Sequence, residues 1–331
     1  MLVFLAHAIE QLDLAAKHIS KGDPNNARFG IMLTDNVLEL ALHQMAKDEQ
    51  HQRESLFNRE KIYPDEAELT AALGRHFDAK VAFFKAHQKL SAEEADSITI
   101  CHGYRNEVYH IGLYHQDILP ALSRFYFHLV CGVLARYNPN FMSYSPSMVL
   151  PERAQKYLST DHLGFGSLKE FQSGCLTLQE SIAFEASDLV SSLSDHMAEV
   201  IEQQDIGVEM IATGGPRQMS RDVAIVESQA WRLAFRQEGK DLLASGKWPG
   251  GSVLDFVNWL AQTYPLMHRR DPIPSWQKRE RSLRSEKDPH KAFKKYKDFM
   301  KQTEGIREFI EESHTQIEMY IDEQIDRMRG K

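Results

Sequence analysis

The chain has 331 residues, 42% of them hydrophobic and 26% charged, and a formal net charge of −8 at pH 7. That is the composition of an ordinary globular protein, long enough for two domains. The negative charge excludes attraction of nucleic acid to the whole surface, so any such binding must use a local basic patch.

The cysteines and the N-terminus predict a cytoplasmic protein. Three cysteines lie far apart with no CxxC pair, which is typical of reduced thiols and gives no zinc motif: Cys101, Cys131 and Cys175. The apolar N-terminus has no early basic residue and is interrupted by Glu10 and Asp13, so we expect no signal peptide. The apolar run 118–134 contains an arginine and a histidine, which favours a buried helix and no membrane partner. The histidines show no metal-ligand spacing, so we expect neither metal nor cofactor.

The apolar residues of the N-terminal part recur at helical spacing, and strand signals are nearly absent. The pattern predicts five helices, at about 5–19, 27–48, 64–90, 91–112 and 118–137. The second is apolar on nearly every side, as is typical of the central helix of a bundle. The fourth starts at Ser91, which forms a capping-box pattern with Glu94.

Residues 138–166 are rich in proline, asparagine and glycine, which indicates a linker. Beyond it, one helix of more than thirty residues is expected to start near Leu168, followed by helices at about 219–244, 252–264 and 291–328. We therefore predict an all-α protein. Its parts would be an N-terminal four-to-five-helix bundle over 1–137, the linker, and a helical region of unassigned role over 167–331.

The most informative stretch is Arg105-Asn106-Glu107-Val108-Tyr109-His110, near the end of the fourth helix. Histidine titrates near neutral pH, so His110 can take the proton of a ribose 2′-hydroxyl or protonate the leaving oxygen. Arginine stays charged, so Arg105 can pair two phosphate oxygens as negative charge develops. Asn106 can hold the imidazole or the phosphate. These residue types suffice for RNA cleavage without a metal.

At 100° per residue, the fourth helix has two distinct faces. An apolar face contains Cys101, Tyr104, Val108 and Ile111, and a polar-aromatic face contains His102, Asn106, Tyr109, His110 and Leu113. Arg105 lies at the edge of the apolar face, about 140° from His110. The polar-aromatic face is typical of an interface or cleft. Two copies meeting across a two-fold axis would gather two arginines and two histidines in one groove.

The second helix supplies supporting residues. Asp35, Asn36 and Glu39 lie inside its apolar stretch. A buried acid needs a partner, and Arg105 is the natural one. We expect Asp35, Glu39, His102 and Tyr109 to support the site.

An N-terminal helical bundle with R-N-x-x-x-H on its fourth helix resembles the HEPN superfamily, over about residues 1–137. The resemblance implies a metal-independent endoribonuclease that acts as a homodimer, with the two motifs in a shared cleft. It also implies a role in toxin–antitoxin systems or anti-phage defence, with an antitoxin or regulatory protein as partner. Carried over residue by residue, Arg105 and His110 would be catalytic, with Asn106 the polar residue that often follows the arginine.

A second nucleic-acid candidate is the basic segment 268–301. Its candidate RNA-binding residues are Arg269, Arg270, Lys278, Arg279, Arg281, Arg284, Lys294 and Lys295. Aromatic residues are interleaved with them, namely Trp276, Phe293, Tyr296 and Phe299, a composition that can follow an RNA backbone and stack on bases. The alternative is a solvated loop and helix face, since acidic residues dilute the patch.

Two functions stay open at this stage. The first is the endoribonuclease, which would leave a 2′,3′-cyclic phosphate. The alternative is a non-catalytic HEPN-like module, in which the same helix face binds a nucleotide or a protein partner.

Overall fold

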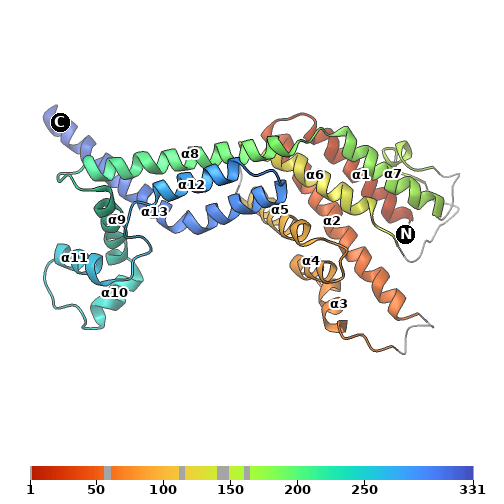
Figure 1. The fold of residues 1–331 in the computed structure, drawn as a ribbon, viewed down its shortest axis with the longest axis horizontal. Coiled ribbons are helices and arrows are strands. Elements are labelled where there is room, and N and C mark those ends of the chain that lie inside the picture. The colour runs from red at the N-terminus through yellow and green to blue at the C-terminus, as the bar shows by residue number, and fades with distance from the viewer. Residues whose placement is uncertain (1, 56–60, 112–115, 140–148, 160–164, 331) are drawn as a thin grey trace. The chain divides into compact units, whose positions relative to one another are not determined.

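The computed structural model describes residues 2–55, 61–111, 116–139, 149–159 and 165–330 (Figure 1). The side chains of residues 108–111 and 165–166 also lie outside the described part. Within the described ranges the regular structure consists of thirteen α-helices and one 3-10 helix, with no strand. The predicted all-α class is confirmed. None of the described helices is both long enough and apolar enough to cross a bilayer.

The described chain forms two compact units. Unit 1 comprises Met1–Leu193 with Lys287–Lys294, and unit 2 comprises Ser194–Glu286 with Lys295–Lys331. The helices of unit 1 are α1 (Leu2–Ile19), α2 (Pro24–Arg53), α3 (Glu66–Leu73), α4 (Phe77–Ala86), α5 (Ala92–Ile111), α6 (Leu119–Ala135), η1 (Ala154–Lys156) and α7 (Phe165–Ser181). Unit 2 contains α9 (Arg221–Phe235), α10 (Gln237–Ala244), α11 (Val253–Thr263) and α12 (Ile273–Arg284). Two helices, α8 (Ala186–Thr213) and α13 (Pro289–Met328), have residues in both units.

Helix α2 is the centre of unit 1, as its all-round apolar pattern predicted. It packs against α1, α3, α4, α5 and α6. It starts cleanly because Pro24 occupies the first turn and the Asp23 side chain accepts from the backbone N–H of Asn26 at 3.0 Å. Helix α5 starts at the predicted capping box, in which Glu94 N donates to Ser91 Oγ at 3.1 Å and Ser91 N donates to Glu94 Oε2 at 2.9 Å.

Three predicted helices are each two helices in the structure. The helix expected at 64–90 breaks at Gly74, whose carbonyl accepts from Lys80 Nζ at 2.6 Å. The long helix expected from Leu168 breaks after Ser181, where the carbonyl of Ile182 accepts from the His128 ring instead of an amide in the same helix. The helix expected at 219–244 turns at Arg236, which is extended. Helix α12 had no predicted counterpart.

The compact units do not coincide with the segments predicted from composition. Helix α7 packs on α1 and α6, inside unit 1. The reason is its apolar face: Phe171, Cys175 and Leu178 are almost fully buried there. The turn-rich residues 138–166 therefore connect two helices of one unit, and the division between units falls inside α8.

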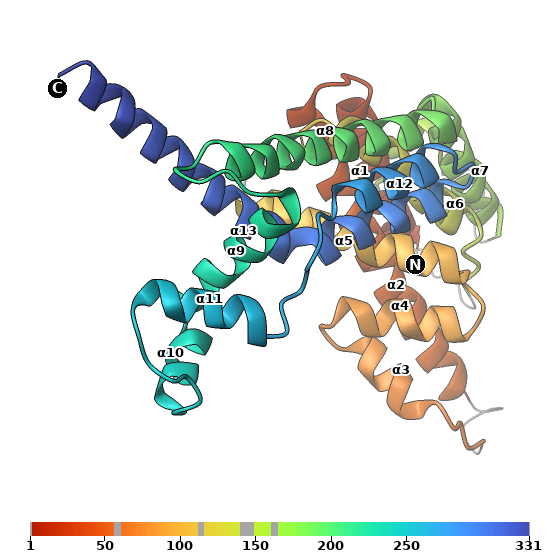
Figure 2. The same cartoon turned by 60° about the vertical axis from the view of Figure 1, so that its left-hand side comes forward.

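Unit 1 also contains a segment from far along the chain. Residues 287–294, at the start of α13, lie beside α5 (Figure 2). The buried Phe293 ring lies 5.9 Å from Tyr104 and 5.7 Å from Phe125. Ser97 and His290 form a hydrogen bond of 2.8 Å, and Lys294 pairs with Asp96 at 2.6 Å. This segment therefore covers the Tyr104 and Phe125 rings of the unit 1 core.

Unit 2 has two parts of its own. Helices α8 and α13 pack closely, since a Cβ at Gly207 would lie 2.9 Å from Ile310. Helix α12 packs its Trp276 ring edge-on against Phe299 of α13, at 5.7 Å. A smaller cluster joins α9 and α11 through buried residues: Ala230, Leu233, Ala234, Phe256, Val257 and Leu260.

Two glycines of unit 1 differ in the space that their surroundings leave for a side chain. A Cβ on Gly30 of α2 would lie 2.4 Å from Cγ1 of Ile19, so α1 and α2 approach too closely for any side chain there. Gly103 of α5 has nothing within 4 Å of a Cβ.

We expect Gly30→Ala to lower the free energy of unfolding by about 1–3 kcal/mol, through overpacking. Its matched control, Gly103→Ala, is expected to raise it by about 0.5–1 kcal/mol, because alanine favours a helix over glycine. Urea denaturation followed by circular dichroism measures both. Equal effects of the same sign would contradict this packing.

Candidate functional site

Asp35 lies at the centre of a polar network inside unit 1. Its side chain is completely buried on α2, where an isolated carboxylate would be strongly unfavourable. It accepts from Arg105 Nε at 2.8 Å, from His102 Nδ1 at 3.0 Å and from Tyr126 Oη at 2.6 Å. The predicted pairing of Arg105 with a buried acid of this helix is confirmed.

The guanidinium of Arg105 is held by three side chains. Besides Asp35, it donates through Nη1 to Asn106 Oδ1 at 2.9 Å and through Nη2 to Glu39 Oε2 at 3.2 Å. A guanidinium has five N–H groups, so one on each Nη makes no hydrogen bond to a described residue. Because 27% of its side chain is exposed, Arg105 is fixed in position and still has donors for a ligand.

His102 is held between Asp35 and an aromatic ring. It stacks on Phe77 with ring centroids 3.9 Å apart and planes 9° from parallel. An ionised carboxylate can only accept, so Nδ1 of His102 is the donor to Asp35. In the neutral ring this leaves Nε2 as an acceptor, and Nε2 forms no hydrogen bond within the described chain.

The network fixes the protonation of its members. Burial alone would raise the pKa of Asp35, but hydrogen bonds from His102 and Tyr126 and the charges of His102 and Arg105 outweigh it, so the pKa is lowered. Burial, followed by the charge of Asp35, raises the pKa of Tyr126 well above its usual value. The same two causes raise the pKa of the Cys101 thiol. Asp35 is therefore ionised, and Cys101 is unsuited to act as a nucleophile.

The charges around Arg105 do not favour an anion by themselves. One positive charge, on Arg105, faces two negative charges, on Asp35 and Glu39, while His102 adds a charge only when protonated. A phosphate approaching the free N–H groups of Arg105 would meet a weakly negative surrounding. Positive charge from outside this cluster is needed to hold RNA there.

The same residues form a cluster with potential metal ligands. One ligand atom each of Asp35, Glu39 and His102 lies within 4.8 Å of the others. However, Arg105 already donates to both carboxylates, and His102 Nδ1 carries the proton shared with Asp35. A metal bound by both carboxylates would have to displace the guanidinium. The arginine thus serves as the cation of this cluster.

The part of the motif that contains His110 lies only partly within the residues that the structure describes. Helix α5 continues to Ile111, so the backbone at residues 109 and 110 is helical as predicted. The side chains of Tyr109 and His110, and residue Leu113, lie outside the described residues. Cys101 and Tyr104, predicted for the apolar face, are buried.

Most of the basic residues proposed to bind RNA are engaged in contacts within their own unit. Arg284 pairs with Asp195 and Glu280, Lys294 with Asp96 and Lys295 with Glu286. Arg269 donates to the carbonyls of Ala261 and Tyr264, Arg281 donates to that of Gln277, and Arg279 lies over the Phe299 ring at 5.1 Å. Among the eight, Arg270 and Lys278 are exposed and make no described contact.

The interleaved aromatic residues cannot stack on bases, contrary to the prediction. Trp276, Phe293, Tyr296 and Phe299 are at most 3% exposed and belong to the cores of their units. Their spacing reflects the buried faces of α12 and α13. The segment is thus a set of amphipathic helices with a charged outer face, which was the alternative interpretation.

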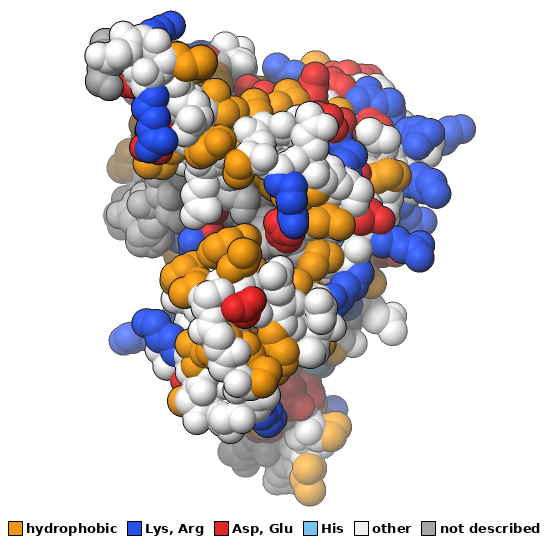
Figure 3. All heavy atoms as spheres, turned by 90° about the vertical axis from the view of Figure 1, so that its left-hand side faces the viewer, with side chains coloured by type: hydrophobic (Ala, Val, Ile, Leu, Met, Phe, Trp, Pro, Cys, Tyr) orange, Lys and Arg blue, Asp and Glu red, His pale blue; other side chains and the backbone are white. Residues whose placement is uncertain are grey.

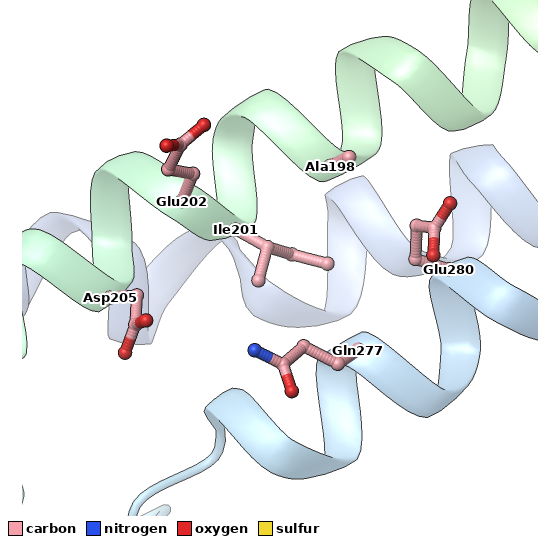
Figure 4. A pocket seen from close by; sticks show the side chains of 6 residues that line it. All are labelled: Ala198, Ile201, Glu202, Asp205, Gln277 and Glu280. Carbon is pink, nitrogen blue, oxygen red and sulfur yellow. The ribbon is translucent and has the colours of Figure 1, made fainter.

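Unit 2 also has an acidic hollow of about 250 Å³ between α8 and α12 (Figure 4). Glu202, Asp205 and Glu280 line it, and Gln277 extends between the helices. Asp205 is paired with Arg221, and Glu280 with Arg284. Its charge makes this hollow unsuitable for an RNA phosphate.

Sequence reasoning missed two members of the network. Tyr126 lies in the apolar run 118–134, and Phe77 lies in the helix predicted at 64–90, for which no functional role was predicted. The acids inside the apolar stretch of α2 were the only signal, and they indicated Arg105 as a partner but not the further donor Tyr126. Comparisons with protein-family models, with curated proteins and with solved structures found no match.

We expect Asp35→Ala to lower the free energy of unfolding by about 3–5 kcal/mol, since it leaves Arg105, His102 and Tyr126 without their common acceptor. The neighbouring Asn36→Ala removes only an exposed hydrogen bond to Gln11 and should stay within about 0.5 kcal/mol of the parent. Urea denaturation measures both. A small loss for Asp35→Ala would show that the network contributes little to stability.

The lowered pKa of Asp35 also predicts a pH dependence. Its contribution to stability is fully present above the ordinary carboxyl pKa of 3.8 and is lost as the pH falls through the lower folded value. The difference in unfolding free energy between the parent and Asp35→Asn should therefore stay constant from about pH 6 to pH 5 and shrink below about pH 4. Parallel urea titrations at these pH values measure it. A difference that grows on acidification would contradict the assignment.

Proposed function

We propose that this chain is a metal-independent endoribonuclease of the HEPN type, acting in the cytoplasm in a toxin–antitoxin or anti-phage role. The observation that carries the proposal is the state of Arg105. Its guanidinium is positioned by Asp35, Glu39 and Asn106 and has two N–H groups that bond to no described residue, at a partly exposed edge. Donors fixed before the reaction stabilise developing charge without reorganisation.

In the proposed reaction, the ribose 2′-oxygen attacks the adjacent phosphorus and the bond to the 5′-oxygen breaks. His110 takes the proton of the 2′-hydroxyl, and a second imidazole protonates the departing 5′-oxygen. The products are a 2′,3′-cyclic phosphate and a free 5′-hydroxyl. Arg105 donates to the non-bridging phosphate oxygens as their charge increases.

The need for two imidazoles favours a homodimer as the active form. The proposed reaction requires one imidazole as the base and another as the acid, and the motif of one copy supplies only His110. A second copy across a two-fold axis would add another arginine and another histidine to the same phosphate. The two imidazoles would then supply the base and the acid.

A second candidate function is a non-catalytic module whose α5 face binds a nucleotide or a protein. The favouring observation is that Asp35 and Glu39 already neutralise Arg105. In that case the network would be purely structural.

The purified full-length protein should cleave single-stranded RNA in the presence of EDTA and leave 2′,3′-cyclic phosphate ends. We expect His110→Ala and Arg105→Lys each to lower the rate by about a hundredfold or more. Lysine keeps one positive charge beside Asp35 and Glu39, which limits unfolding, and circular dichroism checks the fold. The matched controls His51→Ala and Arg75→Ala change exposed residues outside the network and should cleave normally.

If the protein cleaves RNA, Glu39→Gln tests whether Arg105 binds the phosphate. If Arg105 binds phosphate, removal of this carboxylate lowers the KM for RNA, because one negative charge beside the guanidinium disappears. A purely structural network would leave KM unchanged. Absence of cleavage by the parent, with binding of a nucleotide or protein retained, would favour the module.

A further inference from the structure

Unit 2 contains a pocket with a volume of about 490 Å³, within the range of small-ligand sites. It lies among the end of α8, the turn at Gly214–Gly215–Pro216, α9, α11 and α13. The face drawn in Figure 3 shows patches of hydrophobic side chains with single charged groups among them. This site is separate from the motif of α5 and does not depend on the proposed ribonuclease activity.

The apolar part of the pocket includes an exposed aromatic ring. Trp231 of α9 lines the pocket and is 38% exposed. Its ring is parallel to that of Phe235, within 8°, at 6.3 Å. Leu254 and Ile317 add apolar surface from α11 and α13. An accessible indole is the strongest stacking surface that a protein offers to a planar ring.

The polar part offers hydrogen-bonding groups that the protein itself does not use. The amides of Asn258 and Gln316 and the hydroxyl of Ser313 line the pocket. None of the three side chains forms a hydrogen bond within the described chain. Each amide presents a donor and an acceptor side by side. That is also the pattern on the edge of a nucleobase.

The charged groups lining the pocket are one arginine and one acid. Arg217 and Glu227 line it and form an ion pair with each other. The Arg217 side chain is 69% exposed, so this pair is weak and can be exchanged for a stronger partner. A phosphate accepts two hydrogen bonds from a guanidinium and is such a partner. Among the described residues that line the pocket no other side chain is ionisable, and this lining is suited to binding.

We propose that this pocket binds a free ribonucleoside monophosphate. The base would stack on Trp231, with its edge hydrogen-bonded by Asn258 and Gln316, and the phosphate would replace Glu227 as the partner of Arg217. A pocket of this volume accommodates one nucleotide. The second unit is then a sensor for a nucleotide.

Isothermal titration of the full-length protein with AMP, GMP, CMP and UMP, up to millimolar concentration, tests the proposal. At least one should bind, and more tightly than its nucleoside or ribose 5-phosphate. Trp231→Leu should weaken binding by at least about fivefold. The control Val223→Ala changes an exposed apolar residue of the same helix that does not line the pocket, and it should bind normally.

Substitutions of Arg217 and Glu227 test whether the phosphate binds to the arginine, because a purely structural effect would change the binding of monophosphate and nucleoside alike. Arg217→Gln should weaken binding of the monophosphate and leave the nucleoside unaffected, whereas the exposed control Arg270→Gln should change neither. Glu227→Gln should strengthen binding of the monophosphate by up to about fivefold, because it frees Arg217 and removes a repulsive charge. Failure of all four monophosphates to bind would overturn the proposal. So would equal binding by Trp231→Leu, or binding of a short 5′-phosphorylated RNA when no monophosphate binds.

Discussion

The buried carboxylate of Asp35 is the constraint on which the rest of unit 1 depends. A charge without access to water must be matched from every side, and here the matching groups come from α5 and α6. These contacts therefore fix the rotation of α5 about its axis as well as its distance from α2. That rotation determines where Arg105 lies and which face of α5 is available to a ligand or to a second copy.

The sequence was sufficient for the class of fold and for the strongest local signals. The apolar period identified α1, α2, α5, α6 and α11 closely, and the capping box at Ser91 marked a helix start to within one residue. The pairing of Arg105 with an acid of α2 also followed, because a buried charge has few available partners. The features that follow from a local pattern, or from the energetic cost of burying a charge, were thus predictable.

The remaining features depend on contacts between distant residues. The break after Ser181 has neither glycine nor proline, and it is stabilised by His128, which lies more than fifty residues earlier. The aromatic residues of 276–299 looked available because a sequence does not show which helix covers them. Tyr126 lies within an apolar run, and the sequence does not show that its hydroxyl donates to a buried acid, because a tyrosine suits a core position equally well. Each of these required the tertiary structure.

The placement of residues 287–294 has a consequence for the order of events on the ribosome. The Phe293 ring that covers Tyr104 and Phe125 is synthesised about 170 residues after the latter, so unit 1 cannot close its aromatic core until most of the chain has emerged. Helices α5 and α6, which carry these two rings, therefore acquire this cover only late in synthesis. A chain interrupted before residue 287 would leave the motif helix incompletely packed, so a truncated product is unlike the finished protein in the region of its site.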